Sequence, residues 1–172
     1  QRGIEYQVQE AITEGSGFDL LVMGRGEGPG CYCSVNNMLR TFLEDVSSGY
    51  RHVMVDNEAG MEHLSRRTNA KVDLMLVVCD PTPTGLMTAK RIGNLARELG
   101  IIQGKMGLVI NRALEPVTPE AALAATGLEL FACIPEDPRV RDFELQGKPL
   151  TKLPADSPAV AAIDALMAAN GF

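Results

Sequence analysis

The sequence predicts a three-layer α/β fold, with a mostly parallel sheet and helices on both of its faces. Five apolar runs of strand length alternate with amphipathic segments of helical period, and each run is continuous instead of alternating with polar residues. Continuous apolar runs are typical of strands that are covered on both faces. The repeated strand–helix–strand order then requires the crossover connections of a parallel sheet.

The predicted strands lie at residues 18–23, 53–55, 74–79, 106–110 and 130–134. Each ends at a residue that is typical of turns or of binding sites. In order along the chain, these residues are Gly24, Asp56, Asp80, Asn111 and Pro135. Ligands of open parallel sheets bind beyond the carboxyl ends of the strands, so this edge of the sheet is the predicted functional site.

The predicted helices follow from apolar side chains that recur at helical spacing. They lie near residues 4–12, at 38–46, at 86–99, and from 158 to a stop at 170–171. Gly100 follows the third of them at the C′ position. Ser157 and Pro158 supply the N-cap and the first position of the last helix, after a proline-rich stretch that is predicted to be a loop.

The composition is that of one globular domain over residues 1–172. Hydrophobic residues make up 45% of the chain, and no apolar run approaches the ~20 residues that a membrane helix needs. The 16 Lys and Arg residues stand against 22 Asp and Glu residues, which argues against a nucleic-acid backbone as the main ligand. We therefore expect neither a nucleic acid nor a membrane as a partner.

The four cysteines do not form the pattern of a secreted disulfide framework. Cys79 and Cys133 lie inside apolar runs, and Cys31 and Cys33 are too close in sequence for an easy mutual disulfide. A reduced, cytoplasmic protein is the expectation. A lost signal peptide stays open as an alternative, because the chain begins at Gln1 and not at a methionine.

Asp56 and Gly60 have the spacing of a Walker B aspartate and a switch glycine. A carboxylate at the end of a strand can hold Mg²⁺ through water, and a glycine lets a backbone N–H approach a γ-phosphate. An ordinary turn after a strand, in which Asp and Gly are common, explains the same residues equally well.

Two further segments at the same edge are candidate nucleotide-binding residues. Asn111 and Arg112 follow an apolar strand, and an Asn side chain offers both a donor and an acceptor to a purine edge. A simple Asn turn is the alternative, and it is the better interpretation of these two residues taken alone. Pro135, Glu136 and Asp137 give a weaker signal, because this is also a common loop sequence.

Cys31 and Cys33 are candidate metal ligands in a glycine-rich segment. Two thiolates at this spacing can turn toward one soft metal ion, but two ligands do not close a tetrahedral site. The same loop of a second subunit would supply the missing two thiolates. Incidental loop cysteines are the alternative.

The chain contains no Walker A sequence. Its two Gly-Lys pairs, at 104–105 and 147–148, are followed by Met and Pro, and neither has the Ser or Thr that a P-loop requires.

Two segments of the sequence carry a resemblance to a known family. They are residues 24–33, which contain a Cys-x-Cys motif, and residues 55–64, Val-Asp-Asn-Glu-Ala-Gly-Met-Glu-His-Leu. Together they resemble the carbon monoxide dehydrogenase accessory ATPases of the CooC type. These are relatives of MinD, ParA and the nitrogenase iron protein among the deviant Walker (SIMIBI-class) P-loop NTPases. The resemblance implies a homodimer that uses ATP and Mg²⁺ to help insert nickel into carbon monoxide dehydrogenase. It implies that Cys31 and Cys33 of two chains hold Ni²⁺ or Zn²⁺.

The same resemblance implies Walker B and switch roles for Asp56 and Gly60, and base contacts for Asn111 and the loop at Pro135 and Glu136. The Walker A region of the family has no counterpart here, so we expect the chain to be the C-terminal part of a longer ATPase and to be inactive alone. A metal-binding or dimerisation module without nucleotide chemistry, or another MinD/ParA-like ATPase, stays open as an alternative.

Overall fold

The computed structural model describes residues 12–22, 49–57, 59–60 and 71–172. The chain divides into two compact units, which are Gln1–Asp56 with Arg66–Ala70, and Asn57–Ser65 with Lys71–Phe172. The described part of the first unit contains an antiparallel pair of short strands, β1 (Ile12–Glu14) and β2 (Asp19–Leu21). The single domain over 1–172 stays a prediction.

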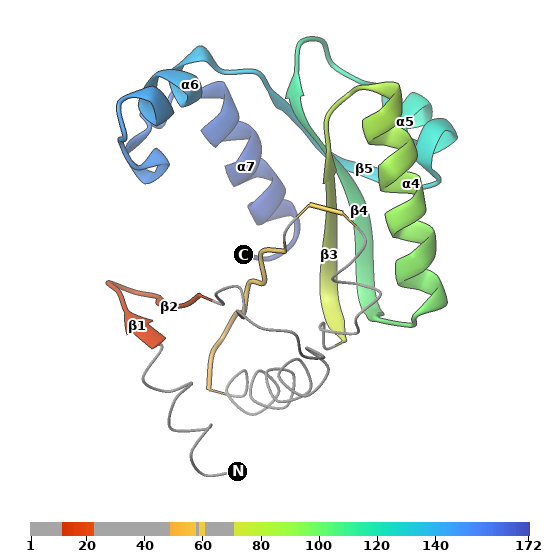
Figure 1. Cartoon of the computed structure of the whole chain (residues 1–172), viewed down its shortest axis with the longest axis horizontal. Coiled ribbons are helices and arrows are strands. Elements are labelled where there is room, and N and C mark those ends of the chain that lie inside the picture. The colour runs from red at the N-terminus through yellow and green to blue at the C-terminus, as the bar shows by residue number, and fades with distance from the viewer. Residues whose placement is uncertain (1–11, 23–48, 58, 61–70) are drawn as a thin grey trace, which may run out of the picture. The chain divides into compact units, whose positions relative to one another are not determined.

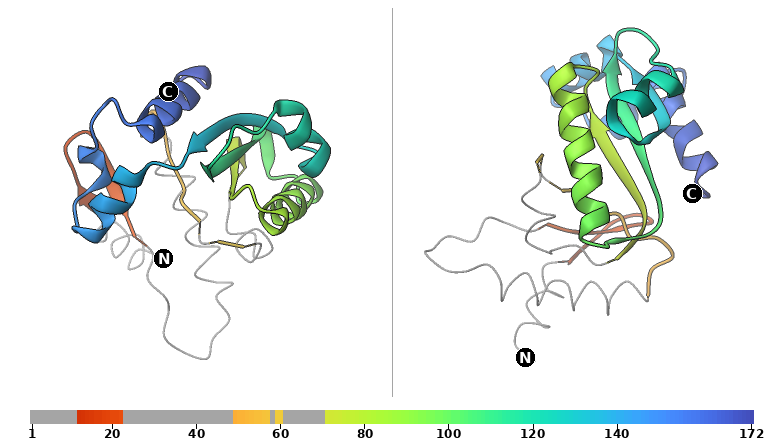
Figure 2. Two further views of the ribbon diagram at one scale, coloured as in Figure 1. Left: turned by 90° about the horizontal axis from the view of Figure 1, so that it is seen from above. Right: turned by 90° about the vertical axis from the view of Figure 1, so that its right-hand side faces the viewer.

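A parallel three-stranded sheet forms the centre of the second unit. Its strands are β3 (Val72–Cys79), β4 (Ile102–Ala113) and β5 (Glu129–Pro135), in the order β3-β4-β5. Helices α4 (Pro83–Glu98) and α5 (Pro119–Thr126) connect the strands and cover one face. Helix α7 (Pro158–Ala169) packs on the opposite face (Figures 1 and 2). The predicted three-layer α/β fold is confirmed.

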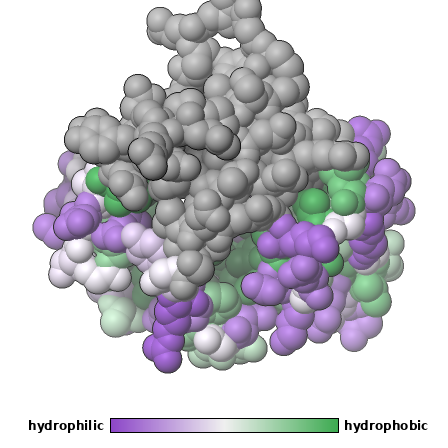
Figure 3. Space-filling view, turned by 90° about the horizontal axis from the view of Figure 1, so that it is seen from below, coloured by the Kyte–Doolittle hydropathy of each residue, from purple (hydrophilic) through white to green (hydrophobic). Residues whose placement is uncertain are grey.

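The remaining described elements are α6 (Pro138–Leu145) and the short 3₁₀ helix η1 (Leu150–Lys152), which join β5 to α7. Seen from below, the described surface is mixed, with apolar patches between hydrophilic side chains (Figure 3). Among the described helices, none has the length and apolar character needed to span a membrane.

The core between the sheet and α4 is built from large side chains on the strands and small ones on the helix. Leu108 and Ile110 of β4 are fully buried, and so is Ala89 of α4. Gly93 lies one turn after Ala89, and a Cβ placed there would meet Leu128 Cδ2 at 3.0 Å. The absence of a large side chain at these positions lets α4 approach the sheet closely.

Each of the four described α-helices begins with the same chemistry, a side-chain oxygen at the N-cap followed by a proline in the first turn. The capping residues are Thr82, Thr118, Asp137 and Ser157. Each accepts a hydrogen bond from a backbone N–H of its own helix, as favoured N-caps do. The predicted start of the last helix at Ser157 is therefore confirmed, as is the C′ position of Gly100, which follows the C-cap Leu99 of α4 with a positive φ.

Three local predictions are wrong. Residues 53–55 form no strand, and Val53, Met54 and Val55 are 48–78% exposed, so these apolar side chains belong to no core among the described residues. Residues 18–23 contribute β2 to an antiparallel hairpin instead of a strand in the parallel sheet.

Ile12, which was assigned to the first helix, begins β1 instead. The cause is the Gly15-Ser16-Gly17 turn, in which Gly17 has a φ of +87° and the Gly15 N–H donates to Phe18 O at 2.8 Å. A left-handed glycine reverses the chain here and ends any helical continuation. The helix predicted at 38–46 lies outside the described residues.

Candidate functional site

The carboxyl ends of the three parallel strands bring together residues from distant parts of the sequence (Figure 1). Arg112, at the end of β4, donates hydrogen bonds to Asp80, which directly follows β3. The Glu136 N–H, just after β5, donates to Ala113 O of β4 at 3.0 Å. The structure thus places Asn111–Arg112 beside both neighbouring strand ends, at the edge where the sequence predicts a ligand.

Asn111 and Arg112 form a bulge in β4. Ile110 pairs with Cys133 and Ala113 pairs with Pro135, so β4 has one more residue than β5 between these two pairs. Arg112 has a φ of +54°, and within the described ranges it is the non-glycine residue with a positive φ. Bulges redirect side chains, and residues held in this sparsely populated region gather at functional sites.

Arg112 is held by a bidentate ion pair with Asp80. Its Nη2 lies 2.9 Å from each carboxylate oxygen, and its Nε lies 3.2 Å from Oδ1. The hydrogen bond to Asp80 raises the pKa of Arg112. Both side chains are exposed, at 68% and 42%, so the pair contributes little to global stability. Its effect is geometric, because it joins the ends of two adjacent strands.

Asp137 is a buried carboxylate at the start of α6, with a side chain only 2% exposed. It accepts hydrogen bonds from Ser157 Oγ at 2.6 Å and from the Arg139 N–H at 2.9 Å. Arg139 in turn donates to the carboxylate and the carbonyl oxygen of Asp156. The Ser157 hydroxyl and then Arg139 lower the pKa of Asp137. This carboxylate therefore holds the N-termini of α6 and α7 together beside the Pro135–Glu136 loop.

Replacing Asp137 by asparagine is expected to lower the Tm at neutral pH, and by more than Asp156→Asn, which removes one exposed contact of the same arginine. The pKa of Asp137 is depressed in the folded state, so its stabilisation is present above the unfolded value of about 3.8 and is lost as pH falls through the folded pKa. The Tm difference between Asp137→Asn and wild type should close below about pH 4, measured by circular dichroism. A pH-independent difference would contradict this assignment.

The other predicted site residues are Asp56, Gly60, Cys31 and Cys33. Asp56 is exposed and belongs to the first unit. Gly60 belongs to the second unit and has a φ of +110°, a conformation that favours glycine. Cys31 and Cys33 lie outside the described residues. No group of three or more metal-ligating side chains is found within the described residues.

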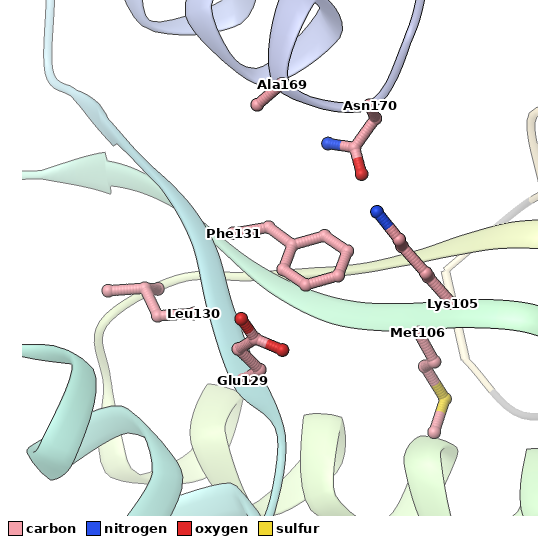
Figure 4. Close-up of a pocket in the computed structure, with 7 residues that line it drawn as sticks. All are labelled: Lys105, Met106, Glu129, Leu130, Phe131, Ala169 and Asn170. Atoms are coloured by element: carbon pink, nitrogen blue, oxygen red, sulfur yellow. The ribbon is translucent and has the colours of Figure 1, made fainter.

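A separate pocket of about 400 Å³ lies beside the amino-terminal halves of β4 and β5, away from Asp80, Arg112 and Glu136 at the carboxyl ends of the strands. It is lined by Lys105, Met106, Glu129, Leu130, Phe131, Ala169 and Asn170. The Lys105 ammonium and the Asn170 carboxamide face each other past the edge of the Phe131 ring (Figure 4). Of the predicted site residues that the structure describes, none lines this pocket.

No family model matches the chain. The chain is 42% identical over 154 residues to an uncharacterized ATP-binding protein of Methanocaldococcus jannaschii, a match that covers 88% of this chain and 60% of that protein. It is 31% identical over 153 residues to the carbon monoxide dehydrogenase accessory protein CooC of Rhodospirillum rubrum, covering 78% and 58%. The chain thus spans less than two thirds of the length of these curated relatives.

Among solved structures, the chain is similar to a ParA family ATPase from Chlorobium tepidum, with a TM-score of 0.71, 16% identity, and coverage of 97% of this chain and 70% of that one. It is also similar to MinD from Pyrococcus horikoshii complexed with Mg-ADP, with a TM-score of 0.64, 22% identity, and coverage of 79% and 56%. The chain therefore has the fold of the MinD and ParA ATPases.

Proposed function

We propose that this chain is the base-binding part of an ATPase of the MinD/ParA class that acts as a nickel-insertion accessory protein for carbon monoxide dehydrogenase. The observation that supports nucleotide binding is the hydrogen bond from the Glu136 N–H to Ala113 O. This bond joins the Pro135–Glu136 loop to the end of β4, two residues after Asn111, and it supports a site at the sheet edge where α/β proteins bind ligands. The similarity to ATP-binding relatives agrees with this proposal.

The proposed roles follow from the chemistry of each residue. The carboxamide of Asn111 binds the edge of the base, and the Pro135–Glu136 loop lies against it. Asp56 holds Mg²⁺ through water, and the backbone N–H of Gly60 contacts the γ-phosphate. The positive φ of Gly60 supports the last role, because a glycine there leaves the backbone open to a phosphate oxygen.

Nickel is the proposed cargo, held by Cys31 and Cys33 of two chains in a proposed homodimer. Four thiolates complete the shell of a soft dication, which two thiolates leave half open to solvent. The similarity to CooC supports carbon monoxide dehydrogenase as the client. A MinD/ParA-like ATPase with a different client is the second candidate, because the identity to the ATP-binding protein of M. jannaschii, 42%, exceeds the 31% identity to CooC.

ATP binding by this chain is expected to be weak, in the millimolar range, and without hydrolysis. Phosphate affinity in P-loop proteins comes from the P-loop amides, its lysine and Mg²⁺ acting together, and this sequence has no Walker A. Asn111→Ala should weaken the residual binding about tenfold, because it removes the main base contact. NMR titration with Mg-ATP measures the affinity.

Asn94→Ala is the matched control for this titration, since Asn94 is exposed on α4, outside the strand-end site. It should bind ATP as tightly as the wild-type chain. Equal affinity of the Asn111→Ala and wild-type chains would contradict the proposed base site, and steady ATP turnover that Asp56→Ala abolishes would contradict the expected inactivity.

A further inference from the structure

We propose that Asp80 and Arg112 are positioning residues that orient the Asn111 carboxamide and so make this edge of the sheet selective for a purine with an amino group at C6 over one with an oxygen there. The inference rests on the proposed nucleotide binding and deepens it. Neither residue is proposed to touch the nucleotide. Their contribution is the shape of the bulge on which Asn111 lies.

The Asn111 carboxamide is oriented by the backbone of the bulge. The Arg112 N–H donates to Asn111 Oδ1 at 3.0 Å, which fixes the oxygen end of the side chain. No hydrogen bond of Nδ2 occurs among the described residues, and Asn111 is half-buried. The carboxamide therefore offers its two N–H donors and one remaining oxygen lone pair to a ligand. Adenine matches this arrangement, because its N7 accepts from Nδ2 while its N6 amino group donates to Oδ1, whereas hypoxanthine, like guanine, has an oxygen at C6 that cannot donate there.

The bulge depends on the left-handed backbone of Arg112. An L residue other than glycine adopts a φ of +54° only where its surroundings hold it there. The side chain of Arg112 supplies that restraint, through three contacts of 2.9–3.2 Å with the carboxylate of Asp80, which directly follows the neighbouring strand β3. Breaking the ion pair releases the bulge, and with it the orientation of Asn111.

The charge of Arg112 is directed into this ion pair and not into a phosphate site. Both donor groups that face Asp80 are engaged, so nucleotide phosphates would have to compete with a bidentate carboxylate. A variant that loses Asp80 frees the guanidinium and strengthens its attraction for any anion, whatever the base. Base selectivity, measured without phosphates, separates positioning from charge.

The test is NMR titration of this chain with adenosine and, separately, inosine at millimolar concentration. Wild type should bind adenosine about tenfold more tightly than inosine. Asp80→Asn and Arg112→Ala should each reduce this ratio to near one, with a change in Tm of no more than about 2 °C because the pair is exposed. The charge swap Asp80→Arg with Arg112→Asp should restore part of the ratio, since Asp tolerates a positive φ.

Asp164→Asn is the control, because it removes one exposed carboxylate from α7 and should keep the wild-type ratio. A wild-type ratio in Asp80→Asn and Arg112→Ala would overturn the positioning role while leaving nucleotide binding in place. Equal binding of adenosine and inosine by wild type would do the same. Absence of adenosine binding by wild type would instead overturn the proposed function, and the inference with it.

Discussion

Replacing Gly107 by alanine is expected to lower the free energy of unfolding by about 3 kcal/mol. Gly107 lies in β4, the central strand, which pairs with β3 and β5 on its two sides. A Cβ at this position would lie 2.3 Å from both Cγ and Cδ2 of Phe131, because the ring packs directly over the glycine. Paired on both edges, the strand cannot shift to relieve the overlap. Urea denaturation followed by circular dichroism measures the loss.

A double-mutant cycle assigns this loss to the aromatic ring. Phe131→Ala removes the ring, so Gly107→Ala should be much less destabilising in that background than in wild type. Gly93→Ala is the comparison for a milder overlap, since its Cβ would meet Leu128 Cδ2 at 3.0 Å and the change gains helix propensity in α4, so it should be less destabilising than Gly107→Ala. An equal penalty for Gly107→Ala with and without Phe131 would rule out the steric explanation.

The Cys31→Ala/Cys33→Ala double variant is expected to lose metal-dependent dimerisation completely. Wild type should bind one Zn²⁺ or Ni²⁺ per two chains, because two thiolates from each chain complete the four-coordinate shell. Thiolate binding releases protons, so the affinity should fall as pH drops below the thiol pKa. Sedimentation with and without metal, together with a metal assay, measures both quantities.

Cys79→Ala/Cys133→Ala is the matched control, since it removes the same number of thiols. Burial raises the pKa of the Cys79 thiol, which makes it a poor metal ligand, and both side chains pack against the core. This control should dimerise with metal as wild type does. A metal-free dimer of the Cys31→Ala/Cys33→Ala variant, or one metal bound per monomer, would contradict the shared thiolate site.

The parallel sheet and its long helices could be predicted because their sequences carry local signals. The strands β3, β4 and β5 follow from apolar runs, and α4 and α7 follow from helical spacing and caps. Helix α5 was missed because its sequence, Pro-Glu-Ala-Ala-Leu-Ala-Ala-Thr, is rich in alanine and has no clear apolar face. The strand predicted at 53–55 is wrong because three apolar residues form a strand only where a neighbouring strand pairs with them.

The sequence also predicted which residues gather at the sheet edge, because whatever follows a parallel strand must lie there. The contacts between them could not be predicted. The bulge at Asn111–Arg112 depends on the pairing register with β5, and the ion pair with Asp80 depends on that bulge. The sequence predicts Asp137 as a nucleotide-binding residue of a loop, whereas its carboxylate accepts a hydrogen bond from Ser157, 20 residues further along the chain. Such contacts exist only after the layers have packed.

The order β3-β4-β5, in which neighbours in the sheet are also successive strands in the chain, bears on how this unit folds. Each new strand needs to close only one helix-containing connection before it meets a partner that is already formed. The entropy lost on closing a connection rises slowly with its length, and low contact order favours fast folding. The sheet can therefore assemble from β3 toward β5 in the order of synthesis, without waiting for a distant segment to arrive between two strands.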